Sequence, residues 1–405
     1  MNGNDFEPLL QKGIMQDGRY VKSASFYAEG DGTKQDVRYS PKVCYITSLA
    51  DYFKLLNEIH ERNEKRLKTE KKECGSLFLY RGQGNANFDY SPTILRHEEK
   101  IRREHILQKE AHRRFYTEFD KCKSIFDEEV ILQHYKAGSR CLDLLENPLM
   151  ALWAACEYTS NEKLKESFGE VSIWCLDYEN DDLKSYDSST VSVIADTATM
   201  EQKFSLGHLE IEYHREHPTD IAHFIYLKDI LRRCVVVRPK YNNIRFTHQF
   251  NCFAVMNLNK LVDYDGSFYK SFGITVEQFS DYILNAEVTN KDKEHVYKNP
   301  NLAWLKEGHH TLNADFSELT EWDLHFEKIA PKDSPFVDTF GMYKYMYNDS
   351  DNKNERVPIY AVVPPDAKDH ILKELSYANV TNANVYPDME IVAKELLQKF
   401  GLENI

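Results

Sequence analysis

The stretch Gly75-Ser76-Leu77-Phe78-Leu79-Tyr80-Arg81-Gly82-Gln83 carries the clearest fold signal in this chain. Its apolar run from Leu77 to Tyr80 lies between a Gly-Ser pair and Gly82, which is typical of a strand buried in a sheet. We predict that this strand ends at Arg81. A strand end holds a guanidinium rigidly, and a neighbouring glycine lets a ligand approach the backbone closely. The stretch therefore predicts a central strand with an anion-binding position at its end.

A plainer interpretation of the same residues stays open. Arg81 would pair with a buried acid such as Asp143, and Gly82 would only turn the chain. In that case the motif serves the fold and binds no ligand.

Outward from this strand, the hydrophobic pattern predicts more strands and helices. The predicted strands cover residues 170–177, 234–238, 253–258 and 359–363. The predicted helices begin after the capping residues Ser48 and Asn147, cover 98–123, 276–284 and 319–329, and include two near the end at 371–375 and 389–400. We therefore expect a mixed α/β (α+β) fold, with a central mixed sheet flanked by helices.

The length of 405 residues has room for about two to three domains. We expect an N-terminal arm over residues 1–43 and a core domain over 44–258. A helical, aromatic-rich insertion or subdomain follows over 259–356, and a C-terminal strand and helices over 357–405 pack back on the core.

Charge and cysteine usage exclude several classes of protein. The net charge is −14 and the isoelectric point is about 5.6, which disfavours general nucleic-acid binding. The eight cysteines show no metal-binding spacing and read as reduced thiols. No window approaches the roughly 18 apolar residues of a spanning helix, and the first residues are polar. We expect a cytoplasmic protein that has no membrane partner and needs no metal.

Polar side chains gather in two further segments. Residues 133–143 hold the densest polar cluster in an apolar setting, and residues 245–249 form another polar group just before a predicted strand. His134 is a candidate base and Gln249 a candidate ligand donor. The plainer readings are a structural histidine, a salt bridge at Asp143 and a sheet-edge amide at Gln249.

Several of these segments share their order and spacing with one family. They are Leu79-Tyr80-Arg81-Gly82-Gln83, Ser91-Pro92-Thr93-Ile94-Leu95-Arg96, residues 133–143, Asn147-Pro148-Leu149-Met150-Ala151-Leu152-Trp153-Ala154-Ala155, Arg245 to Phe253 and Val362 to Asp388. In this pattern the chain resembles the FRG domain, a family named for its (Phe/Tyr)-Arg-Gly motif. The resemblance covers about residues 44–258 and 357–395. Members of the family tend to be bacterial and are similar to proteins found near toxin or phage-defence genes.

The strand-end Arg-Gly, followed by a polar segment and a helix, also looks like the nicotinamide clamp of ADP-ribosyltransferases. This likeness implies an enzyme that acts on NAD or a nucleotide. The Gly82 backbone would hold the carboxamide, Arg81 would pair with a phosphate, Tyr135 would stack on the nicotinamide or ribose, and Ser139 would anchor the clamp. The implied ligand-binding residues are Arg81, Gly82, Gln83, Tyr135, Ser139 and Arg140, and the implied catalytic residues are Asp143, Gln249 and His134.

Two other classes of function stay open. In the first, Arg81, His134, Arg140 and Asp143 form a structural network in a non-catalytic ligand-sensing or protein-interaction module, and the insertion is the recognition surface. In the second, a metal-dependent nuclease uses His134, Asp143 and His248 as ligands. The second is disfavoured because the chain has no HExxH, no paired-acid motif and no Cys-His framework.

Overall fold

The computed structural model describes residues 38–39, 42–86, 88, 90–135, 137–159, 161–180, 182–216, 230–240, 251–263, 269, 273–285, 322–329, 346–350 and 355–385. All structural statements below concern these residues.

Strands and helices alternate along most of the described chain. The strands are β1 (Arg38–Tyr39), β2 (Lys42–Tyr45), β3 (Ser76–Gln83), β4 (Cys141–Leu145), β5 (Gly169–Asp177), β6 (Leu183–Ser185), β7 (Lys203–Ser205), β8 (Arg232–Arg238), β9 (Asn251–Val262), β10 (His325–Lys328), β11 (Glu355–Arg356) and β12 (Ile359–Val363). The α-helices are α1 (Leu49–Glu70), α2 (Glu98–Arg102), α3 (Glu104–Arg114), α4 (Tyr116–Phe119), α5 (Ile125–His134), α6 (Pro148–Cys156), α7 (Ser189–Asp196), α8 (Leu206–Glu216), α12 (Val276–Asn285), α15 (Lys368–Tyr377) and α16 (Asn382–Val385). Two short 3₁₀ helices are η3 (Glu162–Leu164) and η6 (Pro365–Ala367).

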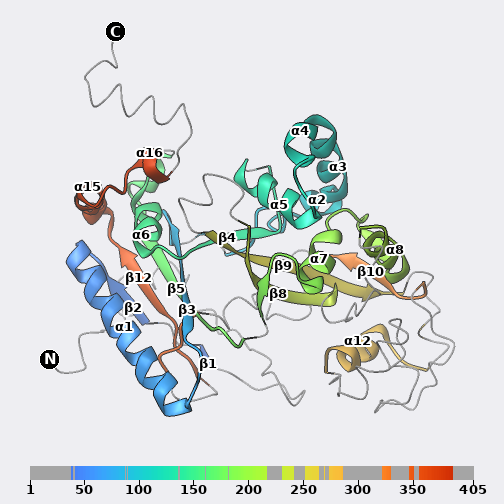
Figure 1. The fold of residues 1–405 in the computed structure, drawn as a ribbon, viewed down its shortest axis with the longest axis horizontal. Helices are drawn as coiled ribbons and strands as arrows, with labels where there is room; N and C mark the ends of the chain where they lie inside the picture. Colours follow the sequence, from blue (N-terminus) through green and yellow to red (C-terminus); the bar gives the residue numbers. More distant parts are fainter. Residues whose placement is uncertain are drawn as a thin grey trace, which may run out of the picture.

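Ten of the described strands form one mixed sheet, which confirms the predicted fold class. Its main path runs β2-β12-β5-β3-β4-β9-β10-β7, with β8 also on β9 and β6 on β8. Most neighbours are antiparallel, whereas β2 runs parallel to β12 and β6 parallel to β8. Figure 1 shows β2, β12, β5 and β3 together in one half of the molecule, and β4, β9, β8 and β10 in the other. The two halves meet where β3 adjoins β4.

The strand β3 is longer than its apolar run predicts. It continues through Gln83, because Arg81 and Gly82 pair with Ser172 and Val171 of β5. The prediction that the strand ends at Arg81 is therefore wrong, and Gly82 does not turn the chain. Hydrogen bonding to a long neighbouring strand extends β3 beyond its apolar residues.

The helices α1, α6 and α15 pack against β3, β5 and β12 (Figure 1). Both predicted caps are present: Ser48 Oγ accepts from the backbone of Asp51, and Asn147 Oδ1 from that of Leu149. Pro148 occupies the first turn of α6, where a missing N–H costs nothing. This layer forms one half of the apolar core, in which alternate side chains of β3 such as Tyr80 are buried.

The opposite side of β3 faces a second apolar cluster that contains Leu77, Leu79 and Trp174. Side chains alternate across a strand, so Arg81 and Gln83 project from this second face and Gly82 from the face that α6 covers. Further along the sheet, α5 and α7 pack on β4, β8 and β9.

Local patterns mispredicted some segments. Residues 98–123 form α2, α3 and α4 instead of one helix, with breaks at Arg103 and Phe115. The helical piece predicted at 319–329 contains the strand β10, which pairs with β7 and β9. The hydrophobic pattern also failed to predict β4, because the polar Asp143 interrupts its apolar residues. The helix predicted at 389–400 lies outside the described residues.

In the part of the chain that the structure describes, every helix is too short or too polar to cross a lipid bilayer.

Candidate functional site

The candidate site lies where β3 and β4 separate. The two strands pair at Tyr80 and Leu145, and beyond that pair β3 continues along β5 alone. Arg81 is the next residue of β3. Its Nη1 reaches across the separation and donates a hydrogen bond of 3.0 Å to the backbone oxygen of Asp143 on β4. Arg81 thus connects the two halves of the sheet through one side chain.

The guanidinium of Arg81 is only partly satisfied. Its Nε is buried and has no hydrogen-bond partner among the described residues. Burial lowers the pKa of Arg81, because the charged form loses its water; Asp143 and Tyr90 oppose this shift, and Arg96 adds to it. A cation that is desolvated and incompletely bonded is a suitable partner for an anionic ligand.

Gln83 lies two residues further along the same face of β3. It is 5% exposed, and its Nε2 donates to the backbone oxygen of Phe88 at 3.1 Å and to Glu170 Oε1 at 3.2 Å. Its Oε1 is buried and has no partner among the described residues. Buried polar atoms nearly always have a partner, so this second unsatisfied atom marks the same region as Arg81.

Glu170 is a buried acid that the sequence did not single out. It faces Gln83 across β3 and β5, and it also accepts a hydrogen bond from the Tyr90 hydroxyl. Burial raises the pKa of Glu170 well above its ordinary value, because the charged carboxylate loses its water. Only one sequence feature hinted at this residue, which is a charged side chain near the start of an otherwise apolar strand.

The segment from Tyr90 to Arg96 brings a second guanidinium to this region. Arg96 is exposed, and its Nε donates a hydrogen bond of 2.9 Å to the backbone oxygen of Ser91. Ile94 and Leu95, just before it, are buried. The backbone of this segment is thus fixed while the end of the Arg96 side chain faces solvent.

Asp143 and the end of α5 adjoin Arg81 from the other side. The Asp143 carboxylate accepts a hydrogen bond of 2.9 Å from Gln133 Nε2, while Arg81 contacts only the Asp143 backbone. The direct ion pair of the plainer interpretation is absent among these described atoms. His134 ends α5 and lies edge-on to the ring of Tyr135 at 5.2 Å. Tyr135 is 65% exposed and is nearly parallel to Phe115, which suits a residue that stacks on a planar ligand.

Gly82 has a packing role in this structure. A Cβ atom at this position would lie 1.8 Å from the backbone oxygen of Ala151 in α6. The backbone of Gly82 pairs with Val171 inside the sheet. The glycine therefore lets α6 lie directly on β3, and its backbone groups point along the sheet instead of toward the face that carries Arg81.

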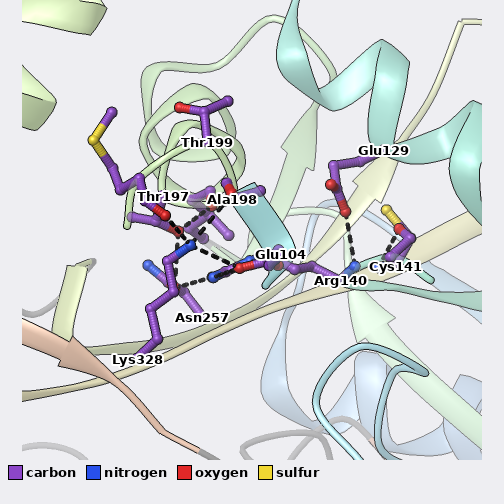
Figure 2. A network of polar contacts seen from close by, with 12 residues as sticks. Glu104, Glu129, Arg140, Cys141, Thr197, Ala198, Thr199, Asn257 and Lys328 are labelled. Atoms are coloured by element: carbon purple, nitrogen blue, oxygen red, sulfur yellow. Dashed lines mark hydrogen bonds and ion pairs between the residues drawn. The ribbon is translucent and has the colours of Figure 1, made fainter. Parts of the chain in front are cut away.

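Ser139 and Arg140 are sealed inside the protein. Ser139 Oγ accepts from the backbone of Cys141 at 3.0 Å. Arg140 is 1% exposed, and its Nε and Nη2 each donate to the Glu104 carboxylate at 2.6 Å (Figure 2). Its third nitrogen donates to Asn257. Each of the three nitrogens of this buried guanidinium donates a hydrogen bond to the protein. Arg140 is therefore unsuited to bind a ligand, in contrast to Arg81.

The same network joins distant parts of the chain. Lys328 Nζ donates to Glu104 at 2.9 Å and to the backbone oxygen of Met200 at 2.6 Å. Glu129 accepts from the backbone of Arg140 at 2.8 Å. Burial raises the pKa of Glu129 to about 7 and lowers that of Lys328 to about 8. Figure 2 shows these groups around Arg140, where they compensate one another's charge.

Two of the residues that the sequence proposed, Gln249 and His248, lie outside the described residues. Among the described ones, His134 and Asp143 belong to no group of three His, Cys, Asp or Glu side chains that could hold a metal ion. The structure thus brings Arg81, Gln83 and Asp143 together and separates Ser139 and Arg140 from them.

The comparison with family models finds a known domain in this chain. The model of the FRG domain matches residues 76–164. The chain contains an FRG domain. The match begins at the first residue of β3 and ends with η3, so the FRG domain includes Arg81, Gln83, Arg96 and Asp143. The wider core domain over 44–258 stays a prediction. No curated protein and no solved structure matches the chain significantly.

Proposed function

We propose that the FRG domain of this protein binds NAD or a related nucleotide at Arg81 and processes it as an ADP-ribosyltransferase or NAD glycohydrolase does, in a bacterial toxin or phage-defence setting. The single observation that carries this proposal is the partly satisfied guanidinium of Arg81 at the separation of β3 and β4. A binding function must be argued from such a site, because a fold alone hosts many functions.

The residues present fit a nucleotide of this kind. The buried Nε of Arg81 is an unsatisfied hydrogen-bond donor, and a phosphate oxygen would accept its hydrogen bond. The buried Oε1 of Gln83 is an unsatisfied hydrogen-bond acceptor, and the carboxamide N–H of nicotinamide would donate to it. Gln83 thereby takes over the carboxamide role that the likeness to ADP-ribosyltransferases gave to the Gly82 backbone. Tyr135 keeps its proposed role as a stacking partner.

In this reaction the bond between the ribose and the nicotinamide of NAD breaks, and its electron pair leaves with nicotinamide. The ADP-ribose then forms a bond to water or to an acceptor group, which loses a proton. The chain contributes acids on both sides of Arg81. Asp143, whose carboxylate Gln133 holds in place, supplies negative charge near the reacting ribose. Glu170, whose pKa is raised by burial, acts as a hydrogen-bonding group beside Gln83. His134 and Gln249 stay further candidates for proton transfer and ribose contact.

The test is nicotinamide release by the full chain, measured by chromatography with NAD and candidate acceptor proteins present. We expect Arg81→Gln to lower the rate about 100-fold, which is typical of losing one charge-stabilising donor. Arg113→Gln is the control, since Arg113 is exposed on α3 and its one partner among the described residues is Glu110. A folded wild-type protein that releases no nicotinamide with any acceptor overturns the proposal.

A specific observation favours a second candidate, a non-catalytic ligand-sensing or protein-interaction module. Two of the proposed binding residues, Ser139 and Arg140, serve a buried network instead. Substituting Arg81→Ala and Asp143→Ala separates the candidates. Lost thermal stability without a separate cellular phenotype favours the module, whereas an unchanged melting temperature with lost toxicity or protection favours the nucleotide site.

A further inference from the structure

The side-chain amide of Gln83 has only one orientation open to it. Its Nε2 donates hydrogen bonds to the backbone oxygen of Phe88 at 3.1 Å and to Glu170 Oε1 at 3.2 Å. A backbone carbonyl oxygen can only accept, so the nitrogen of this amide, and not its oxygen, must face Phe88. Both N–H groups of Gln83 are thereby used, whereas its Oε1 is buried and has no partner in the described part of the chain.

The neighbouring strand β5 holds the second of these acceptors in place. Glu170 is aligned with Gln83 in the sheet, and its Oε1 also accepts a hydrogen bond from the Tyr90 hydroxyl. Glu170 is 1% exposed and Gln83 is 5% exposed, so water cannot readily replace these bonds. Turning the amide over would set its oxygen against the Phe88 carbonyl and leave buried groups unpaired, which is costly. Glu170 and Phe88 therefore fix the polarity of Gln83.

Gln83 consequently presents a ligand with an acceptor and no donor. A ligand atom that meets its Oε1 has to donate a hydrogen bond, as an amide N–H does. A carboxylate oxygen in the same place would set a second, negatively charged acceptor against the amide oxygen. Arg81 Nε, two positions away on the same strand face, is another buried atom without a partner among the described residues. Two such atoms on one face point to a ligand that completes both.

We propose that Gln83 selects a ligand that carries a carboxamide over the same ligand with a carboxylate, and that Glu170 is the positioning residue that sets this preference. The inference rests on the proposed function, for which the preferred ligand is NAD and the rejected one is deamido-NAD, its nicotinic acid form. The two ligands have nearly the same shape and differ only in an NH₂ group against an oxygen. Gln83 discriminates between them through the polarity of its amide and not through the size of the site.

The preference is measured as the ratio of two dissociation constants, from calorimetric titrations of NAD and of deamido-NAD into the full chain. We expect deamido-NAD to bind at least about 100-fold more weakly than NAD, since sites built for an N–H group reject analogues that lack it. Glu170→Met removes the carboxyl and frees one N–H of Gln83, so the ratio should fall at least about 10-fold. Glu170→Gln keeps an oxygen that accepts from Gln83, and the ratio should stay within about 3-fold of wild type.

Glu128→Met is the matched control. Glu128 is also buried, and it accepts a hydrogen bond of 2.7 Å from another glutamine amide, that of Gln108. This second pair joins α5 to α3, so its loss should leave the ratio within about 2-fold of wild type. A variant that only loosens the fold weakens the binding of both ligands alike and does not change the ratio. If Glu170→Met does not fold, the wild-type ratio decides the inference by itself.

The outcomes separate this inference from the proposed function. A preference for NAD that depends on Glu170, with no nicotinamide release, supports the selection by Gln83 and overturns the enzyme. Cleavage of NAD and deamido-NAD with equal kcat/KM supports the enzyme and overturns the selection. Absence of NAD binding, comparable affinity for the two ligands, or an unchanged ratio in folded Glu170→Met overturns the selection as well.

Discussion

Replacing Gly82 by alanine tests whether the glycine of the Arg-Gly motif serves packing or ligand binding. The new Cβ would lie 1.8 Å from the backbone oxygen of Ala151 and 3.1 Å from the Cβ of Ala154. A carbon and an oxygen do not approach within 3.0 Å, so α6 must move away from β3 by more than about 1 Å. The obstacle is helix backbone, which cannot rotate away as a side chain can.

The cost follows from what α6 buries. Ala151 and Ala155 are completely buried, and their contacts with the sheet loosen when the helix moves. Overpacking of a core costs about 1–3 kcal/mol, and a backbone obstacle belongs at or above the upper end. We therefore expect Gly82→Ala to lower the stability by at least about 3 kcal/mol, which corresponds to roughly 6–12 °C in melting temperature for a unit of 150–250 residues.

Thermal unfolding followed by circular dichroism measures this effect. Gly169→Ala should behave alike, because its Cβ would lie 2.0 Å from the backbone oxygen of Ala155. Gly75→Ala is the control: no atom lies within 4 Å of its added Cβ, and the melting temperature should stay within about 2 °C. If Gly82→Ala melts with the control and loses only activity, the packing argument is refuted and the glycine serves the ligand.

Three further outcomes are expected. Arg140→Ala leaves Glu104 buried with Lys328 as its remaining cation, so it should lower the free energy of unfolding, measured in urea, by about 3–5 kcal/mol. A decrease below about 1 kcal/mol contradicts the buried network. The pKa of Glu129 rises from 4.5 to about 7 on folding, so its contribution to stability is complete below pH 4.5 and is lost as the pH rises through 7. Glu129→Gln should therefore gain stability relative to wild type between pH 5 and 8. Plots of melting temperature against pH that run parallel for the two proteins would disprove this. Glu170→Gln removes the ionisable group beside Gln83 and Tyr90. Because burial raises the pKa of Glu170 on folding, wild type loses stability as the pH rises above the unfolded pKa of this carboxyl; the variant should lose less stability over the same range, as pH-dependent melting will show.

Local sequence signals predicted the elements whose cause is local. The caps at Ser48 and Asn147 occur as expected because each capping bond joins residues two or three positions apart. The apolar runs of β3, β5 and β12 are buried strands because their side chains alone favour burial on both faces. The motif of residues 79–83 also led correctly to the FRG domain.

Elements that depend on distant partners escaped the same reasoning. β4 carries Asp143 among leucines, and it is a strand because β9 pairs with its whole length. β10 looks helical by its pattern, yet β7 and β9 enclose it. A short segment with mixed polarity takes the conformation that satisfies its backbone hydrogen bonds, and the neighbours that supply them lie far away in sequence.

Charged side chains show this division most clearly. The sequence makes Arg81 a candidate for ligand binding by its place at the end of an apolar run, and the likeness to ADP-ribosyltransferases adds Arg140. Only the packed chain separates them: Glu104, Lys328 and Asn257 surround Arg140, and Lys328 is 224 residues from Glu104. Among the residues that the structure describes, Arg81 has no comparable partner. Residue type determines that a buried charge needs compensation, whereas the tertiary structure decides whether the protein or a ligand supplies it.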